Sequence, residues 1–364
     1  MLNISLKVLK KIVDNGFDAY IVGGFVRDYI MGRISSDVDI ATNATPMQIK
    51  EIFPNSFIPN EVYGSITVIC DKIRFEITTF RKELLYLNNR KPVQIEYIND
   101  LIDDLKRRDF TINTLCMDSS GKIVDLLNNR IDIDNKIIKT VSNSIDSFSE
   151  DALRILRAVR FATILDFDLD KDIIIAINET KKYLSNISYN RKKDELDKIF
   201  MSTNALKGVN LLIELELDKE LEILNLKDIC LSSDLLGVWS SLEVSCKYPF
   251  TKSEKELIKK IKLLKDFDNL DNKVLYMYGP YVNSIAMKNK GLNSKEVIDR
   301  YNKLPIKVRS DIFITAKEIM TVLNSKPGKY INDIFNELED KILEGTIINE
   351  KQVLKDYILK KYGD

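Results

Sequence analysis

The chain has 364 residues, of which 45% are hydrophobic and 30% charged, as expected for a globular protein of two or three compact units. It contains no histidine, which excludes Ser-His-Asp and Cys-His catalysis, histidine-ligated zinc and the His-Asp module of some phosphohydrolases. Positive and negative side chains balance at 55 each, so a nucleic-acid partner would have to bind through a local excess of positive charge.

The sequence has no segment that predicts a membrane or secretory destination. No apolar run reaches the ~18 residues of a membrane helix, and residues 1–4 do not begin a secretory signal. The four cysteines are far apart and form no CxxC pair, so we expect reduced, mostly buried thiols. We therefore expect a cytoplasmic protein with no membrane partner.

Two patterns follow each other along the chain. Up to about residue 124, short β-patterned runs alternate with amphipathic helical stretches, and Asp71-Lys72 forms a tight hairpin turn between two strands. From about residue 148, leucine and isoleucine recur at three- and four-residue spacing, which predicts helices almost throughout. The fold class is therefore α+β, a mixed head followed by an all-helical remainder. The expected strands cover 19–22, 38–41, 65–70 and 74–80, and the expected helices cover 6–14 and 46–53.

The first expected strand leads into two glycines, Gly23 and Gly24, which open the next helix. Without side chains they let backbone amides approach a phosphate closely, and the helix presents its positive end to the same anion. Arg27 adds a full positive charge in the first turn of that helix. The pattern indicates a binding site for the phosphates of a nucleotide.

Three carboxylates follow on extended segments. Asp37 and Asp39 alternate with Val38, so both carboxylates point to one face while the valine points to the core. Parallel carboxylates repel each other unless a cation lies between them. Glu76, which has apolar neighbours on both sides, could face the same ions from another strand. We assign Asp37, Asp39 and Glu76 as catalytic residues, with Asp37 and Asp39 as ligands of two Mg²⁺ ions that support phosphoryl transfer.

A second nucleotide-binding motif is the run Arg-Arg-Asp-Phe-Thr-Ile-Asn-Thr-Leu at 107–115. Asp109 and Asn113 are four residues apart, so on a helix they would share a face. We expect them to bind the ribose hydroxyls, and we expect Arg108 to bind the triphosphate.

The segment 147–162 predicts how the protein selects a base. Asp151 and Arg154 are expected to face the same way on one helix, and Ser147 with Glu150 matches a capping box. Cytosine and adenine each present an amino donor beside a ring-nitrogen acceptor, so an Asp-Arg pair satisfies both bases. Uracil and guanine present a carbonyl and an N–H instead, which costs about 1–3 kcal/mol for each mispaired group. The nucleotide-binding residues expected in this segment are Glu150, Asp151, Arg154, Arg157 and Arg160.

Together these motifs resemble the polymerase-beta nucleotidyltransferase superfamily, and within it the class II tRNA nucleotidyltransferases (CCA-adding enzymes) and bacterial poly(A) polymerases. The resemblance is close from residue 20 to 200 and diffuse from 200 to 364. It implies a polymerase-beta-type head followed by helical neck, body and tail, and it implies that Glu150 orients its neighbours. The implied domains are a catalytic head at 1–130, a base-selecting neck at 131–200, a body at 201–275 and a tRNA-binding tail at 276–364.

The segment 188–196 resembles the family's neck motif but departs from it at two positions. Asn190 replaces the usual glutamate and Lys192 replaces the usual isoleucine, whereas Arg191 and Glu195 keep their places. The role of this segment is therefore less well defined than that of the preceding motifs.

The resemblance implies template-independent addition of CCA to tRNA 3′ ends from CTP and ATP, with release of pyrophosphate. An A-adding enzyme is the main alternative, followed by CC-adding enzymes and poly(A) polymerases. The charged segment 81–92 keeps the family's full-length loop pattern, which argues against CC-only addition. A non-catalytic RNA-binding relative would not need the three carboxylates, and a small-molecule nucleotidyltransferase would not need the Asp-x-x-Arg element.

Positive charge that could bind RNA is concentrated between residues 288 and 309, where it is opposed only by Glu296 and Asp299. We expect this stretch to contact tRNA mainly through phosphate charge and shape. The residues are Lys288, Lys290, Lys295, Arg300, Lys303, Lys307 and Arg309.

Overall fold

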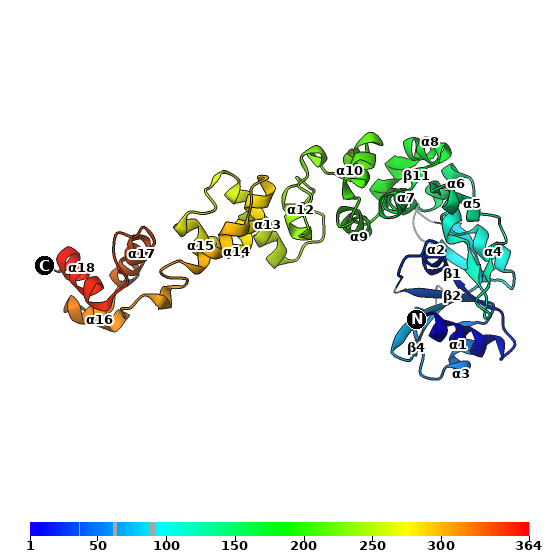
Figure 1. Ribbon diagram of the computed structural model, residues 1–364, viewed down its shortest axis with the longest axis horizontal. Coiled ribbons are helices and arrows are strands. Elements are labelled where there is room, and N and C mark those ends of the chain that lie inside the picture. The colour runs from blue at the N-terminus through cyan, green and yellow to red at the C-terminus, as the bar shows by residue number, and fades with distance from the viewer. Residues whose placement is uncertain (36, 61–63, 87–91, 364) are drawn as a thin grey trace. The chain divides into compact units, whose positions relative to one another are not determined.

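A computed structural model describes residues 1–35, 37–60, 64–86 and 92–363, with the backbone alone at 59–60, 83–86 and 92–94 (Figure 1). The chain divides into two compact units, and it passes between them more than once. The first unit comprises residues 1–227 and 244–249, and the second comprises 228–243 and 250–364.

The head is built on a seven-stranded mixed sheet whose strand order is β3-β4-β5-β2-β1-β8-β9. Strand β2 pairs with β5 in parallel and with β1 in antiparallel register, so it lies inside the sheet. The strands are β1 Ala19–Val22, β2 Val38–Thr42, β3 Phe57–Asn60, β4 Ser65–Cys70, β5 Ile73–Thr79, β8 Cys116–Met117 and β9 Ile123–Val124.

The turn between β4 and β5 has the conformation that the sequence predicts. Asp71 and Lys72 both have positive φ, 48° and 65°, as a two-residue type I′ hairpin requires. Beyond β5, strands β6 (Arg81–Tyr86) and β7 (Pro92–Tyr97) form a separate antiparallel hairpin. The predicted loop 81–92 falls on this hairpin, and residues 87–91 of it lie outside the described part of the chain.

Helices cover the head, and they form the remainder of the first unit together with a two-stranded parallel sheet of β10 (Ile137–Ile138) and β11 (Asp168–Leu169). Helix α7 contributes to the core there, because Ile155, Leu156 and Val159 on one side are completely buried. The helices are α1 Leu2–Val13, α2 Gly24–Ile30, α3 Pro46–Ile52, α4 Leu101–Lys106, α5 Arg130–Asp134, α6 Ser144–Glu150, α7 Leu153–Leu165, α8 Lys171–Thr180, α9 Tyr189–Phe200, α10 Ala205–Glu214 and α11 Leu217–Glu220.

The second unit is helical throughout its described residues. Helix α14 is interrupted where Gly279 takes a φ of 74° immediately before Pro280, which cannot donate a backbone hydrogen bond. The helices are α12 Leu235–Ser240, α13 Lys252–Leu263, α14 Asn272–Asn289, α15 Lys295–Asn302, α16 Ala316–Val322, α17 Tyr330–Leu343 and α18 Lys351–Tyr362. None of the helices described is both long and apolar enough to cross a membrane.

The predicted fold class is confirmed, since a mixed α+β head precedes helices almost without interruption. The finer boundaries at residues 130, 200 and 275 stay predictions.

Candidate active site

Two of the predicted catalytic carboxylates lie side by side on the sheet. Asp39 on β2 is the register partner of Glu76 on β5, and both side chains are exposed on the same face. Val38 and Ile40 point the other way and are buried. Asp37, just before β2, is also exposed. The alternation expected from the sequence therefore holds in the structure.

The protein environment disfavours a negative charge on Asp39 in the absence of a cation. Its carboxylate is open to solvent but surrounded by protein atoms, and this loss of hydration raises its pKa. The neighbouring Glu76 and, more weakly, Asp37 raise the pKa further, while Arg108 opposes them. Such repulsion is expected where carboxylates are arranged to receive a metal ion.

The donor set fits magnesium, a hard cation that prefers oxygen ligands. Within the described residues, no three acidic or cysteine side chains converge closely enough to hold an ion by themselves. Magnesium in phosphoryl-transfer sites is usually held by one or two carboxylates, and substrate phosphates and water complete its shell. The predicted ligands Asp37 and Asp39, with Glu76 beside them, therefore fit a magnesium site whose shell a substrate would complete.

Gly23 brings the chain into contact with this group of carboxylates. Its φ of 73° and ψ of −137° are accessible essentially to glycine alone. A Cβ at Gly23 would lie 3.7 Å from Nη1 of Arg108 and 3.9 Å from Oδ2 of Asp39. The turn thus lies beside both Arg108, predicted to bind phosphate, and Asp39, predicted to bind metal, and Gly24 follows it at the start of α2.

The sequence led us to expect that Arg27 projects toward a phosphate. In the structure its side chain is bonded within the protein instead. The side chain is buried, and its Nε and Nη2 donate to Oδ1 of Asp28 at 2.9 and 2.8 Å. Its Nη1 donates to Oδ1 of Asn113 at 2.8 Å. Arg27 therefore orients Asn113.

Asp109 and Asn113 meet, but they do not lie on one helix. Helix α4 ends at Lys106, and a short 3₁₀ helix begins at Thr111. Across this turn the amide of Asn113 donates to Oδ1 of Asp109 at 3.1 Å. The expected helical spacing is wrong, because the turn alone brings these side chains together.

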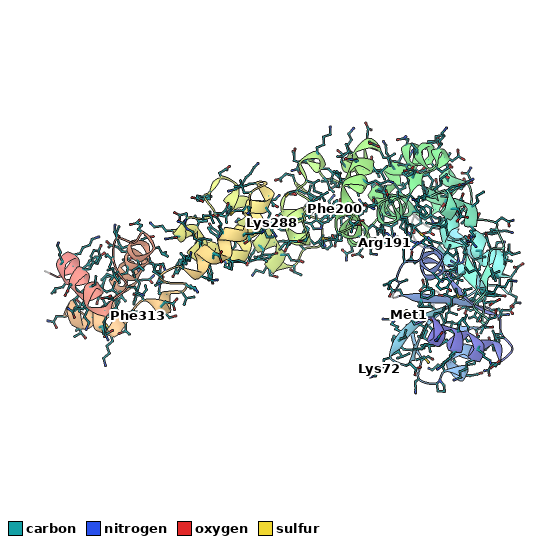
Figure 2. The ribbon with its side chains drawn as sticks, in the orientation of Figure 1. Met1, Lys72, Arg191, Phe200, Lys288 and Phe313 are labelled. Atoms are coloured by element: carbon teal, nitrogen blue, oxygen red, sulfur yellow. The ribbon has the colours of Figure 1, made fainter. Side chains whose placement is uncertain are left out.

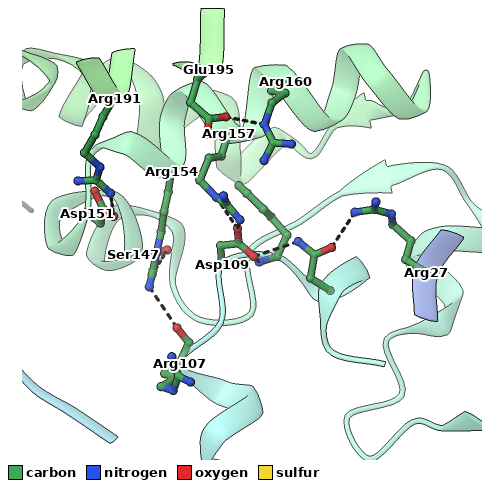
Figure 3. Close-up of polar contacts among 12 residues, drawn as sticks. Arg27, Arg107, Asp109, Ser147, Asp151, Arg154, Arg157, Arg160, Arg191 and Glu195 are labelled. Carbon is green, nitrogen blue, oxygen red and sulfur yellow. Dashed lines mark hydrogen bonds and ion pairs between the residues drawn. The ribbon is translucent and has the colours of Figure 1, made fainter. Parts of the chain in front are cut away.

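Arg157 of α7 donates through Nε to Oδ2 of Asp109 at 2.8 Å (Figure 3). Burial raises the pKa of Asp109, but the charge and hydrogen bond of Arg157, the hydrogen bond from Asn113 and the charge of Arg154 together outweigh burial and hold that pKa far below its ordinary range. Asp109 is thus ionised and fixed in orientation. The contact also ties α7 to the Arg-Arg-Asp motif of the head.

Asp104 is a site residue that the sequence reasoning missed. Its buried carboxylate accepts from Arg107 at 2.6 Å and from Arg108 at 3.0 Å. Burial raises its pKa, but the two guanidinium groups lower it overall. The signal was available in the sequence, since an aspartate three and four residues before two arginines faces both on a helix.

Arg108 retains hydrogen-bonding capacity. Its Nε is buried without a partner among the described residues, and its Nη1 lies next to Gly23. A buried unsatisfied donor is uncommon in a protein and is most simply explained by a missing acceptor. A phosphate oxygen is such an acceptor.

The segment predicted to select the base is not the continuous helix expected from the sequence. Helix α6 ends at Glu150, Asp151 has extended backbone geometry, and α7 begins at Leu153. The predicted capping box is also wrong, because Ser147 lies inside α6 and Asn143 caps its N-terminus. The two-helix arrangement arises because the Asp151 carboxylate accepts from the amide of Leu153 at 3.1 Å and starts the new helix.

Arg154 and Asp151 do not pair with each other in this structure (Figure 3). Arg154 donates to Oγ of Ser147 at 2.8 Å and to the carbonyl oxygen of Arg107 at 3.1 Å. Its Nη1 also lies 3.6 Å from Glu150, consistent with the expectation that Glu150 orients its neighbours. Asp151 instead accepts from Arg191 of α9.

Arg160, the last predicted nucleotide-binding residue, makes its contacts within the protein. It forms an ion pair with Glu195 of α9 and lies over the ring of Phe161, 4.1 Å from its centroid. With Arg157 held by Asp109, both arginines organise the site from within α7.

The predicted RNA-binding residues have two different environments. Arg309 is bonded to Glu339 and Asn332, and Lys290 to Asn269 and the carbonyl oxygen of Phe267, so these two cross-link the second unit. Lys288 lies on α14 and is half-buried (Figure 2). The exposed cations that form no ion pair within the described residues are Lys295, Arg300, Lys303 and Lys307.

Comparison with known proteins places the chain in a family. Residues 19–139 match the family model of the poly A polymerase head domain, 166–223 a probable RNA- and SrmB-binding site of polymerase A, and 250–358 a putative tRNA nucleotidyltransferase domain 2. The CCA-adding enzyme of Ligilactobacillus salivarius is 36% identical over 96% of this chain and 94% of its own length. The chain belongs to the CCA-adding enzyme family. The enzyme of Bacillus subtilis is 32% identical over 97% of each chain.

Solved structures agree with this family. The CCA-adding enzyme of Bacillus stearothermophilus, solved in complex with CTP, is 26% identical and superimposes with a TM-score of 0.87 over 99% of this chain and 97% of its own. The Thermotoga maritima CCA-adding enzyme, solved with tRNA, is 20% identical with a TM-score of 0.71 over 99% and 95%, and it supports the fold alone. The prediction of a tRNA nucleotidyltransferase is confirmed.

Proposed function

We propose that this CCA-adding enzyme extends tRNA 3′ ends from CTP and ATP with two magnesium ions, and that Asp151 and Arg154 choose the base. The observation that carries the proposal is the grouping of Asp39, Glu76 and Arg108 around the Gly23 turn. It occurs in a chain that is related over almost its whole length to CCA-adding enzymes. We also place the protein in the cytoplasm.

Asp37 and Asp39 would hold the ions, with Glu76 beside them on β5. When bound, magnesium neutralises triphosphate charge and lowers the pKa of the attacking 3′-hydroxyl. Arg108 supplies further positive charge and an unused donor for the triphosphate. Asp109 and Asn113 present polar atoms to the ribose, and Arg157 and Arg27 hold them in place.

Base selection would follow from the hydrogen-bonding pattern of the bases. Asp151 accepts from the amino group that cytosine and adenine share, and Arg154 donates to the adjacent ring nitrogen. A carbonyl facing Asp151 and an N–H facing Arg154 would leave both protein groups mispaired, which rejects uracil and guanine. The position of Arg154 between Glu150, Ser147 and the Arg107 carbonyl supports a fixed rather than a mobile selector.

The full CCA activity is favoured over A-only addition by the kinship with CCA-adding enzymes. A single-nucleotide-resolution extension assay tests it on tRNA transcripts that end at the discriminator base or at CC. We expect growth by CCA on the first transcript and by A on the second. Extension of only the CC-ended transcript would mean an A-adding specialist.

A further inference from the structure

Asp151 lacks the support that a helix gives its side chains. It lies in the break between α6 and α7, where its Oδ1 accepts from the amide of Leu153 at 3.1 Å. A side chain that selects a base has to be held to a fraction of an ångström, because small misplacements are costly in rate and selectivity. Some other group must therefore fix the second carboxylate oxygen.

That group is Arg191. Its Nη2 donates to Oδ2 of Asp151 at 3.0 Å, across forty positions of sequence, and the two side chains are 23% and 18% exposed. Arg154 cannot serve this purpose in the structure, because its guanidinium is directed to Ser147 and to the Arg107 carbonyl. Within the described residues, Arg191 forms the one ion pair of Asp151.

Arg191 belongs to a helix that supports the selector at a second point. Glu195, one turn later on α9, pairs with Arg160 of α7, and the close-up shows both contacts directed from α9 toward the same segment (Figure 3). Residues at i and i+4 share a helix face, so Arg191 and Glu195 lie on the same face of α9. This face supplies one guanidinium and one carboxylate to the segment that contains Asp151 and Arg160.

The geometry of Arg191 is not that of an ion pair optimised for stability. Its Nη1 is buried and has no hydrogen-bond partner among the described residues. A buried donor without an acceptor destabilises a fold, so a purely structural arginine would be expected to satisfy it.

We propose that Arg191 is a positioning residue for base selection. It occupies one lone-pair direction of Oδ2 and leaves the other for the amino group of cytosine or adenine. The inference rests on the proposed role of Asp151 in choosing the base. It adds a third side chain to a selector that the sequence predicts as a pair.

Arg191→Met tests the proposal, measured as the ratio of kcat/KM for CTP over UTP and for ATP over GTP. We expect both ratios to fall at least about tenfold. Arg191→Lys keeps the charge but loses the planar fork, so it should restore part of the selectivity, and it serves as the second variant if the methionine variant is unstable. The matched control is Lys198→Met, which removes an exposed charge from the same helix and should leave both ratios unchanged.

A double-mutant cycle separates positioning through Asp151 from any other role. If Arg191 acts through Asp151, Arg191→Met should reduce selectivity no further in an Asp151→Ala background. Full additivity, or wild-type selectivity in Arg191→Met, would overturn the inference. If the wild-type enzyme adds CCA but the Asp151→Ala variant keeps wild-type selectivity, the proposed selector itself is contradicted. If the wild-type enzyme adds no CCA, the proposed function is contradicted.

Discussion

Asp39 and Glu76 are adjacent carboxylates on paired strands, and Arg108 provides the main opposing charge. The arrangement destabilises the free protein to some extent, because it gathers negative charge where hydration is reduced. Such costs are common at functional sites, where groups are placed for a ligand and not for the fold.

Asp39→Asn should separate activity from stability. We expect turnover to fall at least about 100-fold, because removing a metal ligand forfeits several kcal/mol of transition-state stabilisation. The melting temperature should stay the same or rise, since the change removes repulsion with Glu76. Extension assays and thermal unfolding measure the two effects. Asp71→Asn in the β4–β5 turn is the control, and near-wild-type turnover in Asp39→Asn would rule out the metal site.

The raised pKa of Asp39 also predicts a dependence of stability on pH. Because its folded-state pKa exceeds its unfolded-state value, the ionised side chain destabilises the fold above both values, and protonation removes this cost as the pH falls. Without metal, the melting temperature of wild type minus that of Asp39→Asn should therefore become more negative from about pH 4 to about pH 8. Saturating magnesium should abolish the trend. A difference that does not change with pH contradicts the assignment.

Arg154→Ala should relax selectivity against UTP and GTP by about 10- to 100-fold, which corresponds to one or two mispaired groups. Arg154 also bonds Ser147 and the Arg107 carbonyl, so the variant should lose stability as well. The ratio of kcat/KM values is therefore the decisive measurement. Arg33→Ala is a suitable comparison, because Arg33 also binds α7, at the carbonyl oxygen of Ile164, but carries none of the proposed selector's bonds. Unchanged ratios in Arg154→Ala would refute the selector.

At the scale of elements, the site depends on turns between regular segments. Gly23 joins β1 to α2, a 3₁₀ turn joins Asp109 to Asn113, and Asp151 separates α6 from α7. Each turn positions polar groups that the sequence assigns to nucleotide or metal binding, while the strands and helices around it supply the buried core.

Gly23→Ala should test the first turn. The backbone conformation costs an alanine about 1–3 kcal/mol, and the added methyl group would lie against Arg108 and Asp39. We expect lower stability together with a loss of turnover of about 100-fold. Gly16→Ala provides the control, because Gly16 has a φ of 88° and no atom within 4 Å of its Cβ position. It should lose stability alone, and equal activity losses in both variants would refute the role of Gly23.

At the scale of the whole molecule, the formal charge is zero, so tRNA binding must rely on local surfaces. Of the predicted basic residues, Arg309 and Lys290 stabilise the second unit internally. The exposed cations on and near α15 remain available for phosphate.

The triple variant Lys295→Gln/Arg300→Gln/Lys303→Gln should weaken tRNA binding at low salt. The slope of log K against log salt should decrease by about 0.7–0.9 for each phosphate that the variant no longer neutralises. Equilibrium binding across a salt series measures this. Lys255→Gln/Lys259→Gln/Lys265→Gln removes the same charge from exposed positions on and just after α13. If that control weakens binding equally, net charge and not the predicted surface is responsible.

The sequence alone was sufficient to predict the fold class and the side of the strand on which the carboxylates lie. Alternation places Asp37 and Asp39 opposite Val38, and the hairpin at Asp71-Lys72 follows from its turn residues, because both properties depend on neighbours along the chain. The Arg-Arg-Asp and Glu-Asp-x-x-Arg motifs indicated the family, because each motif consists of residues that are close together along the chain.

The partners of charged side chains were decided by tertiary structure. The sequence predicts that Asp151 and Arg154 face the same way on one helix, whereas the fold pairs Asp151 with Arg191, forty residues away. It also directs Arg27 to Asn113. A helical spacing specifies only neighbours three or four residues apart, and a single break between α6 and α7 redirects every side chain after it. Which cation meets which carboxylate depends on how α7 and α9 pack, and that is a property of the folded chain alone.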